Sequence, residues 1–292
     1  MDIKAEPLFD VETDLGEGPL WSAEEEALYW LDVTQRTIWR HDTGSGQTNK
    51  FAVSGMPGSI AVRAQGGILA AFRTGLALVD LENGTETKLA SPIDFGKERF
   101  NDGKCDRRGR FFAGTMDKTM QSTIGGLYRI DPDHTVTRVA DGIRLSNGIG
   151  WSPDNKTLYH CDSRPGYVYA YDYDIETGTV ANRRIHIDFT TRDDHAHPDG
   201  CTVDAEGCLW IAEVGAWSVG RYDPAGKRMG GIKLPVKRVS SVMFGGTNLD
   251  VLFVTTMRYN LSPEESASQP LAGYVFAAQP DVKGLAEIPF AG

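Results

Sequence analysis

Alternating apolar and polar residues, interrupted by short polar turns, recur along this chain. The stretch SNGIGWSPDNKTLYHCD, from Ser146 to Asp162, alternates, turns at Pro153-Asp154-Asn155 and alternates again. A period of two residues is typical of half-buried β-strands, and a turn rich in Pro, Asp and Asn joins such strands as a hairpin. We therefore predict a β-hairpin over residues 146–162.

The same plan occurs six times in the chain. Each copy has a small or polar opening, an alternating strand, a polar turn and a strongly apolar strand. The copies begin at Glu17, Gly58, Asn101, Asn147, Asp199 and Ser241. These starts are separated by 41, 43, 46, 52 and 42 residues. A four-stranded propeller blade repeats every ~40–45 residues, so six copies indicate six blades.

A third strand follows each hairpin, as in GLALVDL from Gly75, and usually a fourth, weaker one, as in ETKLA from Glu86. The last copy lacks a fourth strand, while IKAEPLFDV from Ile3 alternates before the first copy. We predict an all-β, six-bladed β-propeller with four antiparallel strands per blade, closed by the N-terminal strand in the last blade. Residues 1–292 then form a single domain. No capped helical stretch separates the strands, and EESASQP, residues 264–270, forms at best one short turn.

Net charge and composition limit the classes of partner that the protein is expected to bind. The formal charge is −10 and no basic face is concentrated anywhere, which argues against nucleic acid and anionic membranes as partners. No run of eighteen apolar residues and no signal-peptide pattern occurs, so we expect a cytoplasmic protein. The sequence carries no signature of an oligomeric state.

The four cysteines, Cys105, Cys161, Cys201 and Cys208, show no CxxC spacing and are too sparse for a disulfide framework. We expect buried free thiols. Five tryptophans fall at alternating strand positions and are expected to pack between blades rather than to stack on a ligand: Trp21, Trp30, Trp39, Trp151 and Trp210.

Polar residues open the first strands of the repeats. In a propeller these strands line the central channel, so Glu17, Asn101, Asn147 and Asp199 are expected to converge near one end of the axis. Carboxylate and amide oxygens gathered in one volume need a cation, and oxygen ligands suit Ca²⁺, Mg²⁺ or Mn²⁺. For any one of these residues alone, a turn-forming role in NG, DG or EG is the simpler interpretation.

The motifs GEGPLW, ERFNDGKCDRRGRFFAGTM, SNGIGWSPDNKTLYHCD, HPDGCTVDAEGCLWIA and QPLAGYVFA resemble the SMP-30/gluconolactonase/regucalcin-like family, from about Glu12 to the end. Members are six-bladed propellers that hydrolyse sugar lactones with one divalent cation. The resemblance implies that Glu17, Asn147 and Asp199 are the metal ligands, which coincide with the residues that the repeat brings together.

The resemblance also implies substrate contacts. The arginine and asparagine of RFND correspond to Arg99 and Asn101, and Asp199 corresponds to the general base of the family. Some members place a sugar-binding glutamate just beyond GTM, whereas this chain reads GTMDKT and offers Asp117 slightly early and Thr119 after it. Asp117 is therefore expected to contact the substrate, and the specificity for sugar hydroxyls stays open.

The run DDHAHPDG allows another interpretation, because His195, His197 and Asp199 would share one face of an extended strand and imitate a zinc site. Asp-Asp and His-Pro are more typical of a loop, which favours a role for His197 at the rim or in substrate contact. Trp217, between glycines in EVGAWSVG, could contact substrate at the rim or simply pack.

A serine nucleophile finds little support. GxSxG is absent, and Ser59, Ser146 and Ser240 near the strand starts are expected to be turn residues.

We expect metal-dependent hydrolysis of a sugar lactone to the aldonic acid, with one divalent cation that could be Ca²⁺, Zn²⁺, Mg²⁺, Mn²⁺ or Fe²⁺. Two alternatives stay open: a non-enzymatic calcium-binding or regulatory protein, and a propeller esterase or phosphotriesterase. The particular sugar and its ring size are set by loops and are not encoded in the repeat.

Overall fold

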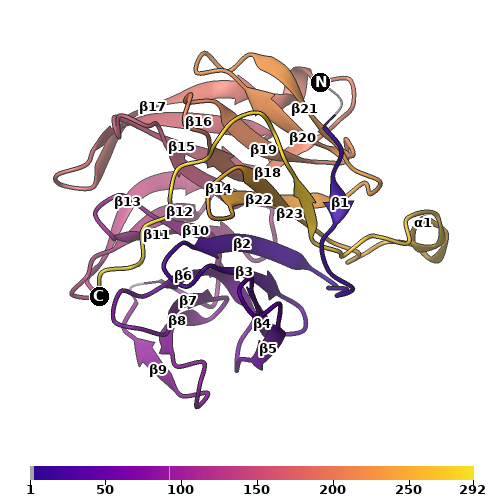
Figure 1. Cartoon of the computed structure of the whole chain (residues 1–292). Helices are drawn as coiled ribbons and strands as arrows, with labels where there is room; N and C mark the ends of the chain where they lie inside the picture. Colours follow the sequence, from indigo (N-terminus) through magenta and orange to yellow (C-terminus); the bar gives the residue numbers. More distant parts are fainter. Residues whose placement is uncertain (1–2, 92) are drawn as a thin grey trace.

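The computed structural model describes residues 3–91 and 93–292, which form six four-stranded antiparallel sheets around a central axis (Figure 1). Each inner strand contacts the inner strands of both neighbouring blades, so the sheets close into a ring. The predicted all-β, six-bladed β-propeller is confirmed.

Blades 1 to 5 each use four consecutive strands, running from the axis outward. Blade 1 comprises β2 (Gly16–Ser22), β3 (Ala27–Asp32), β4 (Thr37–Asp42) and β5 (Thr48–Ala52). Blade 2 comprises β6 (Pro57–Val62), β7 (Ile68–Phe72), β8 (Gly75–Val79) and β9 (Glu86–Leu89). Blade 3 comprises β10 (Glu98–Cys105), β11 (Phe111–Asp117), β12 (Gly125–Ile130) and β13 (Val136–Ile143).

Blade 4 comprises β14 (Ser146–Trp151), β15 (Thr157–Asp162), β16 (Tyr167–Asp174) and β17 (Thr179–Asp188). Blade 5 comprises β18 (His197–Val203), β19 (Leu209–Val214), β20 (Ser218–Tyr222) and β21 (Arg228–Lys233). The 146–162 hairpin predicted from the alternation is the β14–β15 pair.

Blade 6 joins the two ends of the chain. It contains β22 (Val239–Gly245), β23 (Val251–Thr256) and β24 (Phe276–Ala278), and its fourth strand is β1 (Glu6–Pro7). Glu6 pairs with Ala277 and Pro7 with Phe276, so the predicted closure by the N-terminal strand is confirmed. The paired segment is shorter than the alternating stretch from Ile3 suggested, since Pro7 cannot donate a ladder hydrogen bond.

In the described residues, two short helices lie outside the sheets: the 3₁₀ turn η1 (Phe189–Thr191) and α1 (Pro263–Ser268). Ser262 caps α1 and its side chain accepts a hydrogen bond from the backbone N–H of Glu265, whose carboxylate accepts one from Ser262 N. This capping box stabilises a single exposed turn, as the EESASQP stretch predicted.

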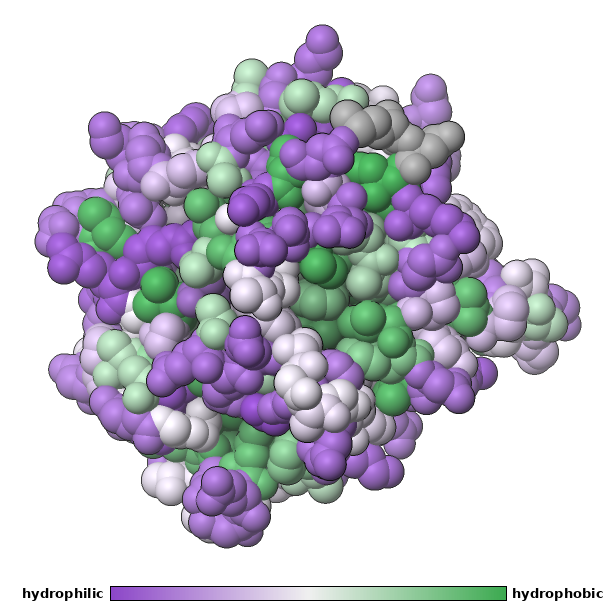
Figure 2. Space-filling view, in the orientation of Figure 1, coloured by the Kyte–Doolittle hydropathy of each residue, from purple (hydrophilic) through white to green (hydrophobic). Residues whose placement is uncertain are grey.

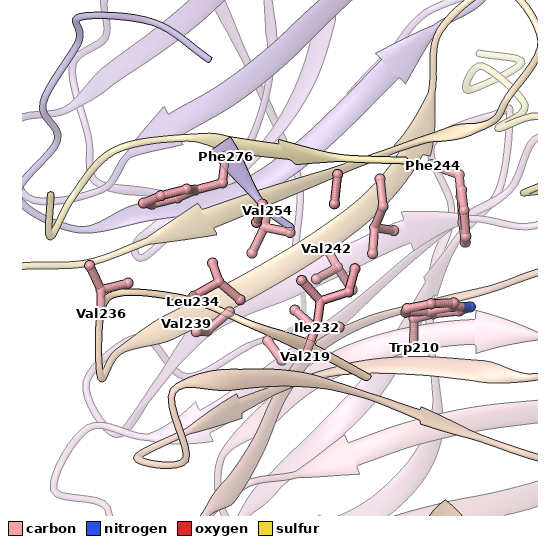
Figure 3. Packing of buried hydrophobic residues seen from close by; sticks show 14 of the residues in the cluster. Trp210, Val219, Ile232, Leu234, Val236, Val239, Val242, Phe244, Val254 and Phe276 are labelled. Atoms are coloured by element: carbon pink, nitrogen blue, oxygen red, sulfur yellow. The ribbon is translucent and has the colours of Figure 1, made fainter. Parts of the chain in front are cut away.

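Apolar side chains fill the layers between blades. Trp210, Val219 and Ile232 of blade 5 belong to the same buried cluster as Val242 and Val254 of blade 6 (Figure 3). Trp21, Trp30, Trp151 and Trp210 are buried as predicted, and Trp39 is partly buried and stacks on Trp30 at 5.8 Å between ring centroids. All four cysteines are free and buried, also as predicted.

The C-terminal segment closes one end of the channel. Phe290 is buried and its backbone bonds to Val62 and Ala64 of blade 2, while Gly284 N donates to Leu249 O of blade 6. The segment thus runs back across the ring from β24 to the C-terminus (Figure 1). A channel cavity of about 230 Å³ lies next to Glu287, and hydrophilic side chains cover most of the periphery in Figure 2.

Candidate functional site

Every inner strand carries an irregularity near its first residues. In each case the register against the second strand shifts, at Glu17/Leu20, Pro57/Ser59, Phe100/Gly103, Ser146/Ile149, Pro198/Cys201 and Val239/Ser241. A β-bulge bends the strand and redirects a side chain. Because the bulges occur at equivalent places around the ring, the residues within them meet at one end of the axis, the mouth of the channel.

Glycines following the mouth residues allow the inner strands to approach closely. A Cβ on Gly148 would lie 2.5 Å from the carbonyl oxygen of Asp199, and one on Gly200 would lie 2.7 Å from the Cα of Ser241. Neither glycine has a positive φ. The NG and DG pairs are therefore strand residues in close contact with the next blade, and their interpretation as turn formers is wrong at these positions.

Three carboxylates face this mouth: Glu17, Asp102 and Asp199. Burial, followed by repulsion from Asp102, raises the pKa of Glu17 to about 8, and burial raises the pKa of Asp102 to about 6. Burial, then repulsion from Glu17 and Asp102, raises the pKa of Asp199 well above its ordinary value. These shifts indicate that the three carboxyl groups disfavour ionisation because water is largely excluded around them and because neighbouring negative charges repel one another.

The Asn147 amide is held in one orientation. Its Oδ1 accepts a hydrogen bond from Asn101 Nδ2 at 2.6 Å, and its Nδ2 donates to Ser163 Oγ at 2.7 Å. Ser163 Oγ donates in turn to the carbonyl oxygen of Pro198 at 2.5 Å, which ties blade 4 to the residue before Asp199. Because Nδ2 of Asn147 faces Ser163, the amide oxygen Oδ1 of Asn147 faces the mouth, where Asn101 also lies.

The donor set fits a hard divalent cation. Asp199 is 7 % exposed, and its Oδ1 is buried without a hydrogen-bond partner among the described residues. The only hydrogen bond that the described residues make to the Glu17 carboxylate is from the N–H of Gly18, at 3.4 Å. Two carboxylates with so few donors, beside an oriented amide oxygen, form an oxygen site that a cation would satisfy.

The site holds no larger acidic or imidazole cluster. Across residues 3–91 and 93–292, no group of three or more His, Cys, Asp and Glu side chains is arranged to hold a metal. A cation bound by Glu17 and Asp199 would therefore need a third protein ligand of another kind, such as an amide oxygen. His197 is exposed at the start of β18, opposite Val214, and the zinc-like grouping of His195, His197 and Asp199 does not form in the described structure.

Arg99 lies at the edge of the mouth. Its guanidinium donates to Asn101 Oδ1 at 2.8 Å and to the carbonyl oxygen of Phe100 at 3.2 Å. Burial and the nearby positive charge of Arg73 lower the pKa of Arg99 to about 9, and Glu17 acts in the opposite direction. Arg99 thus connects the carboxylate cluster with a neighbouring cationic region.

Asp117 organises its own loop. Its carboxylate accepts hydrogen bonds from the backbone N–H groups of Thr119 at 3.0 Å and Ser122 at 2.8 Å, and from both hydroxyls at 2.8 Å. These donors hold the pKa of Asp117 well below its usual range. Both oxygens are engaged within the loop, and its contact with substrate stays a prediction.

Trp217 lies in the turn between β19 and β20 with φ of 58° and is 37 % exposed. Since Val214 pairs with His197 at the start of β18, this turn is on the same face as the mouth. The exposed part of the ring is compatible with the rim role, while the larger part of its surface is covered by neighbouring atoms.

The three serines considered as turn residues have a different role. Ser59 Oγ donates to Asn101 O at 2.9 Å, and Ser240 Oγ donates to Gly16 O at 2.6 Å. Each of these hydrogen bonds joins two adjacent blades. Ser146 Oγ bonds His160 Nε2 at 2.6 Å, with both residues buried. The expectation of turn residues is wrong, because these serines satisfy backbone and side-chain groups between strands.

Two mouth residues were not anticipated. Asp102 follows Asn101 directly in RFND and enters the mouth because the β10 bulge turns adjacent side chains toward the axis. Ser163 follows the apolar strand of the fourth repeat, and only its hydrogen bond with Asn147 shows that it helps to orient the Asn147 amide. The repeat position of Asp102 was a usable signal, whereas Ser163 had none.

None of the helices in the described residues is long and apolar enough to cross a bilayer.

Comparisons with known proteins agree with this architecture. A sequence profile described as "SMP-30/Gluconolactonase/LRE-like region" matches residues 15–258. Regucalcin of Danio rerio is 36% identical over 294 residues, covering 99% of both chains. A 6-deoxy-6-sulfogluconolactonase of Pseudomonas putida is 37% identical over 279 residues, covering 95% of both chains.

A solved structure described as a calcium-binding protein, regucalcin, from Agrobacterium tumefaciens superimposes with a TM-score of 0.92 at 27% identity, covering 100% of this chain and 98% of the other. The profile match and the full-length relatives show the family, as the motifs GEGP, RFND, SNG and PDG indicated. This chain belongs to the SMP-30/gluconolactonase/LRE-like family.

Proposed function

We propose that this protein hydrolyses a sugar lactone to the corresponding aldonic acid, with one divalent cation bound by Glu17, Asn147 and Asp199. The observation that carries the proposal is the buried Oδ1 of Asp199, which finds no hydrogen-bond partner in the described part of the chain, beside a second poorly hydrogen-bonded carboxylate and an oriented amide oxygen. The name of the Pseudomonas putida relative, 6-deoxy-6-sulfogluconolactonase, supports lactone hydrolysis.

A divalent cation bound at this place supplies Lewis-acid polarisation of the lactone carbonyl, worth several kcal/mol of transition-state stabilisation. Asp199 takes a proton from water as the water oxygen attacks the carbonyl carbon. The bond between the carbonyl carbon and the ring oxygen then breaks, and Asp199 returns the proton to that oxygen. The products are one hydroxyl and one carboxylic acid, which releases a proton at neutral pH. Such general-base assistance contributes about 10²–10⁴-fold.

Arg99 and Asn101 orient the sugar. The amide of Asn101 bonds both Asn147 Oδ1 and the carbonyl oxygen of Ser146, so its position is fixed by blade 4. The guanidinium of Arg99 is held by Asn101 and still has donors directed away from it. Pre-positioned donors lower the entropic cost of reaching the reactive geometry.

The direct test is acid release from a panel of aldonolactones, after treatment with chelator and after re-addition of individual cations. We expect activity to be lost on chelation and restored by at least one divalent ion. Turnover that continues in full in excess chelator would contradict the metal requirement, and no turnover of any lactone with any ion would contradict the activity.

A calcium-binding role without catalysis is the second candidate, favoured by the several full-length relatives named regucalcin. It uses the same oxygen atoms and needs no water activation. A protein that binds Ca²⁺ and hydrolyses none of the panel would support it.

A further inference from the structure

A second concavity adjoins the mouth on the side of Arg99. Its volume is about 430 Å³, and four of its eight lining residues are cationic: Arg36, Arg73, Arg99 and Lys118. The others are neutral, and none is acidic. We name this concavity the cationic pocket.

The cations come from equivalent places in successive blades. Arg36 lies in the turn between β3 and β4, Arg73 in the turn between β7 and β8, and Lys118 directly after β11. Because second strands run antiparallel to inner strands, these turns lie on the face where the inner strands begin. The ring geometry therefore places them next to the proposed metal ligands.

Protein carboxylates do not neutralise this pocket. Within the described residues, none of the four cations takes part in an ion pair. Arg73 Nε is buried and has no hydrogen-bond partner in that part of the chain, and Lys118 Nζ donates only to the carbonyl oxygen of Phe95. Burial lowers the pKa of Arg73, and Arg73 in turn helps to lower the pKa of Arg99.

Positive groups brought together without carboxylate partners repel one another and lose hydration, so they indicate an anionic ligand. The chain as a whole carries a net charge of −10, which makes the local excess of cations more distinctive. Guanidinium groups in particular match the geometry of phosphate, sulfonate and carboxylate oxygens.

We infer that the cationic pocket binds an anionic group on the substrate, at the end remote from the lactone carbonyl, so that the substrate is an anionic aldonolactone. This rests on the proposed function for the reaction at the mouth. Arg99 lies between the two regions, since it bonds Asn101 on one side and lines the pocket on the other. The loop after GTM, where a carboxylate could accept hydrogen bonds from neutral sugar hydroxyls, presents Lys118 to the pocket, while Asp117 is engaged within the loop.

The test compares kcat/KM for glucono-lactones that carry phosphate, sulfonate or carboxylate at the terminal carbon with kcat/KM for neutral glucono-lactone. We expect the anionic substrates to be preferred by roughly 10- to 100-fold, and Arg73→Met to remove most of this preference, as expected for the loss of a hydrogen bond to a charged group. The anionic lactone with the highest kcat/KM relative to the neutral lactone identifies the anion that the pocket binds.

Lys118→Ala and Arg36→Ala, at the exposed rim, should each lower the preference by about 3-fold and are safe for folding because both side chains are exposed. Arg184→Met, on the exposed outer strand of blade 4, is the matched control and should leave the preference unchanged. Equal use of neutral and anionic lactones, unaltered in Arg73→Met and Lys118→Ala, would overturn the inference while leaving the lactonase proposal intact.

Calorimetry separates the two proposals. Chelator-treated protein should bind 6-phosphogluconate more tightly than gluconate, and Arg73→Met should remove the difference. Tighter binding of 6-phosphogluconate without hydrolysis of any lactone would support the pocket and contradict the proposed activity. Equal binding of both acids would count against the pocket.

Discussion

Two buried acidic regions of this propeller differ in how their charge is balanced. Glu213 on β19 is fully buried, and its carboxylate accepts hydrogen bonds from Arg192 at 2.5 Å, Arg228 at 2.9 Å, and the hydroxyls of Tyr222 and Ser218 at 2.6 Å. Burial acts to raise its pKa, but the hydrogen bonds from Arg228 and Arg192 prevail and lower the pKa of Glu213 to about 2.

Glu17 and Asp199 at the channel mouth have no such donors. Burial raises the pKa of both, followed by repulsion from Asp102 for Glu17 and by repulsion from Glu17 and Asp102 for Asp199, and Asp199 Oδ1 has no partner among the described residues. The same chemical group is thus a satisfied structural element in one place and an unsatisfied one in the other. The difference teaches that burial of a carboxylate does not by itself indicate a functional site, whereas burial of a carboxylate without hydrogen-bond donors or cations to balance it does.

The largest expected effect comes from removing the proposed base. Asp199→Asn should lower kcat for lactone hydrolysis by about 10²–10⁴-fold, because the amide cannot accept the proton from water. Chelator-treated Asp199→Asn should be at least as heat-stable as the parent, since one repelling carboxylate is gone. Acid-release kinetics and thermal unfolding check both points, and undiminished turnover would exclude Asp199 as base.

Glu213→Gln should have the opposite effect on stability. Arg192 and Arg228 would lose their buried anion, which costs roughly 3–5 kcal/mol in the free energy of unfolding. Denaturant unfolding measures this loss. Glu176→Gln is the control, because the ion pair of Glu176 with Arg108 is exposed and should contribute less than about 1 kcal/mol. Equal losses in the two variants would remove the contrast between the acidic regions.

The pH dependence of stability follows from the raised pKa of Glu17. In the unfolded chain this carboxyl ionises near 4.5, whereas in the folded protein its pKa is about 8, so the free energy of unfolding of chelator-treated protein falls as pH rises between these values. We expect the melting temperature to drop on the order of 5 °C between pH 5 and pH 8.

Glu213 adds little to this change between pH 5 and pH 8, because it is ionised in the folded protein, where its pKa is about 2, and largely ionised in the unfolded chain, where it titrates near 4.5. Glu17→Gln should make the profile shallower, with the raised pKa values of Asp102 and Asp199 responsible for the slope that remains, and a divalent cation should restore the melting temperature at pH 8. A profile that is already flat in the chelated parent would contradict the assignment of an uncompensated carboxyl cluster.

Ser163→Ala should have the smallest effect. The Asn147 amide would lose the acceptor that fixes its orientation, and loss of such a supporting hydrogen bond weakens metal binding by about 10-fold or more. Titration of the apo protein with Ca²⁺ measures the affinity. Ser152→Ala, in the exposed hairpin turn of blade 4, provides the comparison, and equal affinities in the two variants would assign Ser163 a purely structural role.

The convergence of distant residues followed from periodicity alone. Glu17, Asn101, Asn147 and Asp199 occupy equivalent repeat positions, and a closed ring must bring equivalent positions together. The apolar alternation likewise sufficed to predict the blades and their closure through β1. The glycines next to Asn147 and Asp199 were harder to interpret, because NG and DG serve equally in turns and in tightly packed strands.

The cationic pocket could not be predicted from the periodicity of the sequence. Arg36, Arg73 and Lys118 lie in turns whose sequences share no motif, and the net negative charge of the chain gave no sign of a local positive region. The role of Asp117 could not be predicted from the sequence either. Its carboxylate oxygens accept hydrogen bonds within a loop whose path depends on Thr119 and Ser122.

The sequence by itself determined the architecture and the convergence of Glu17, Asn101, Asn147 and Asp199, because a repeated pattern of apolar side chains specifies both the strands and their order around the axis. Tertiary structure alone decided which carboxylates are matched by donors, how the Asn147 amide is turned and where unpaired cations meet. These are properties of distances between side chains from different blades, and electrostatic energies depend steeply on such distances and on the water excluded around them.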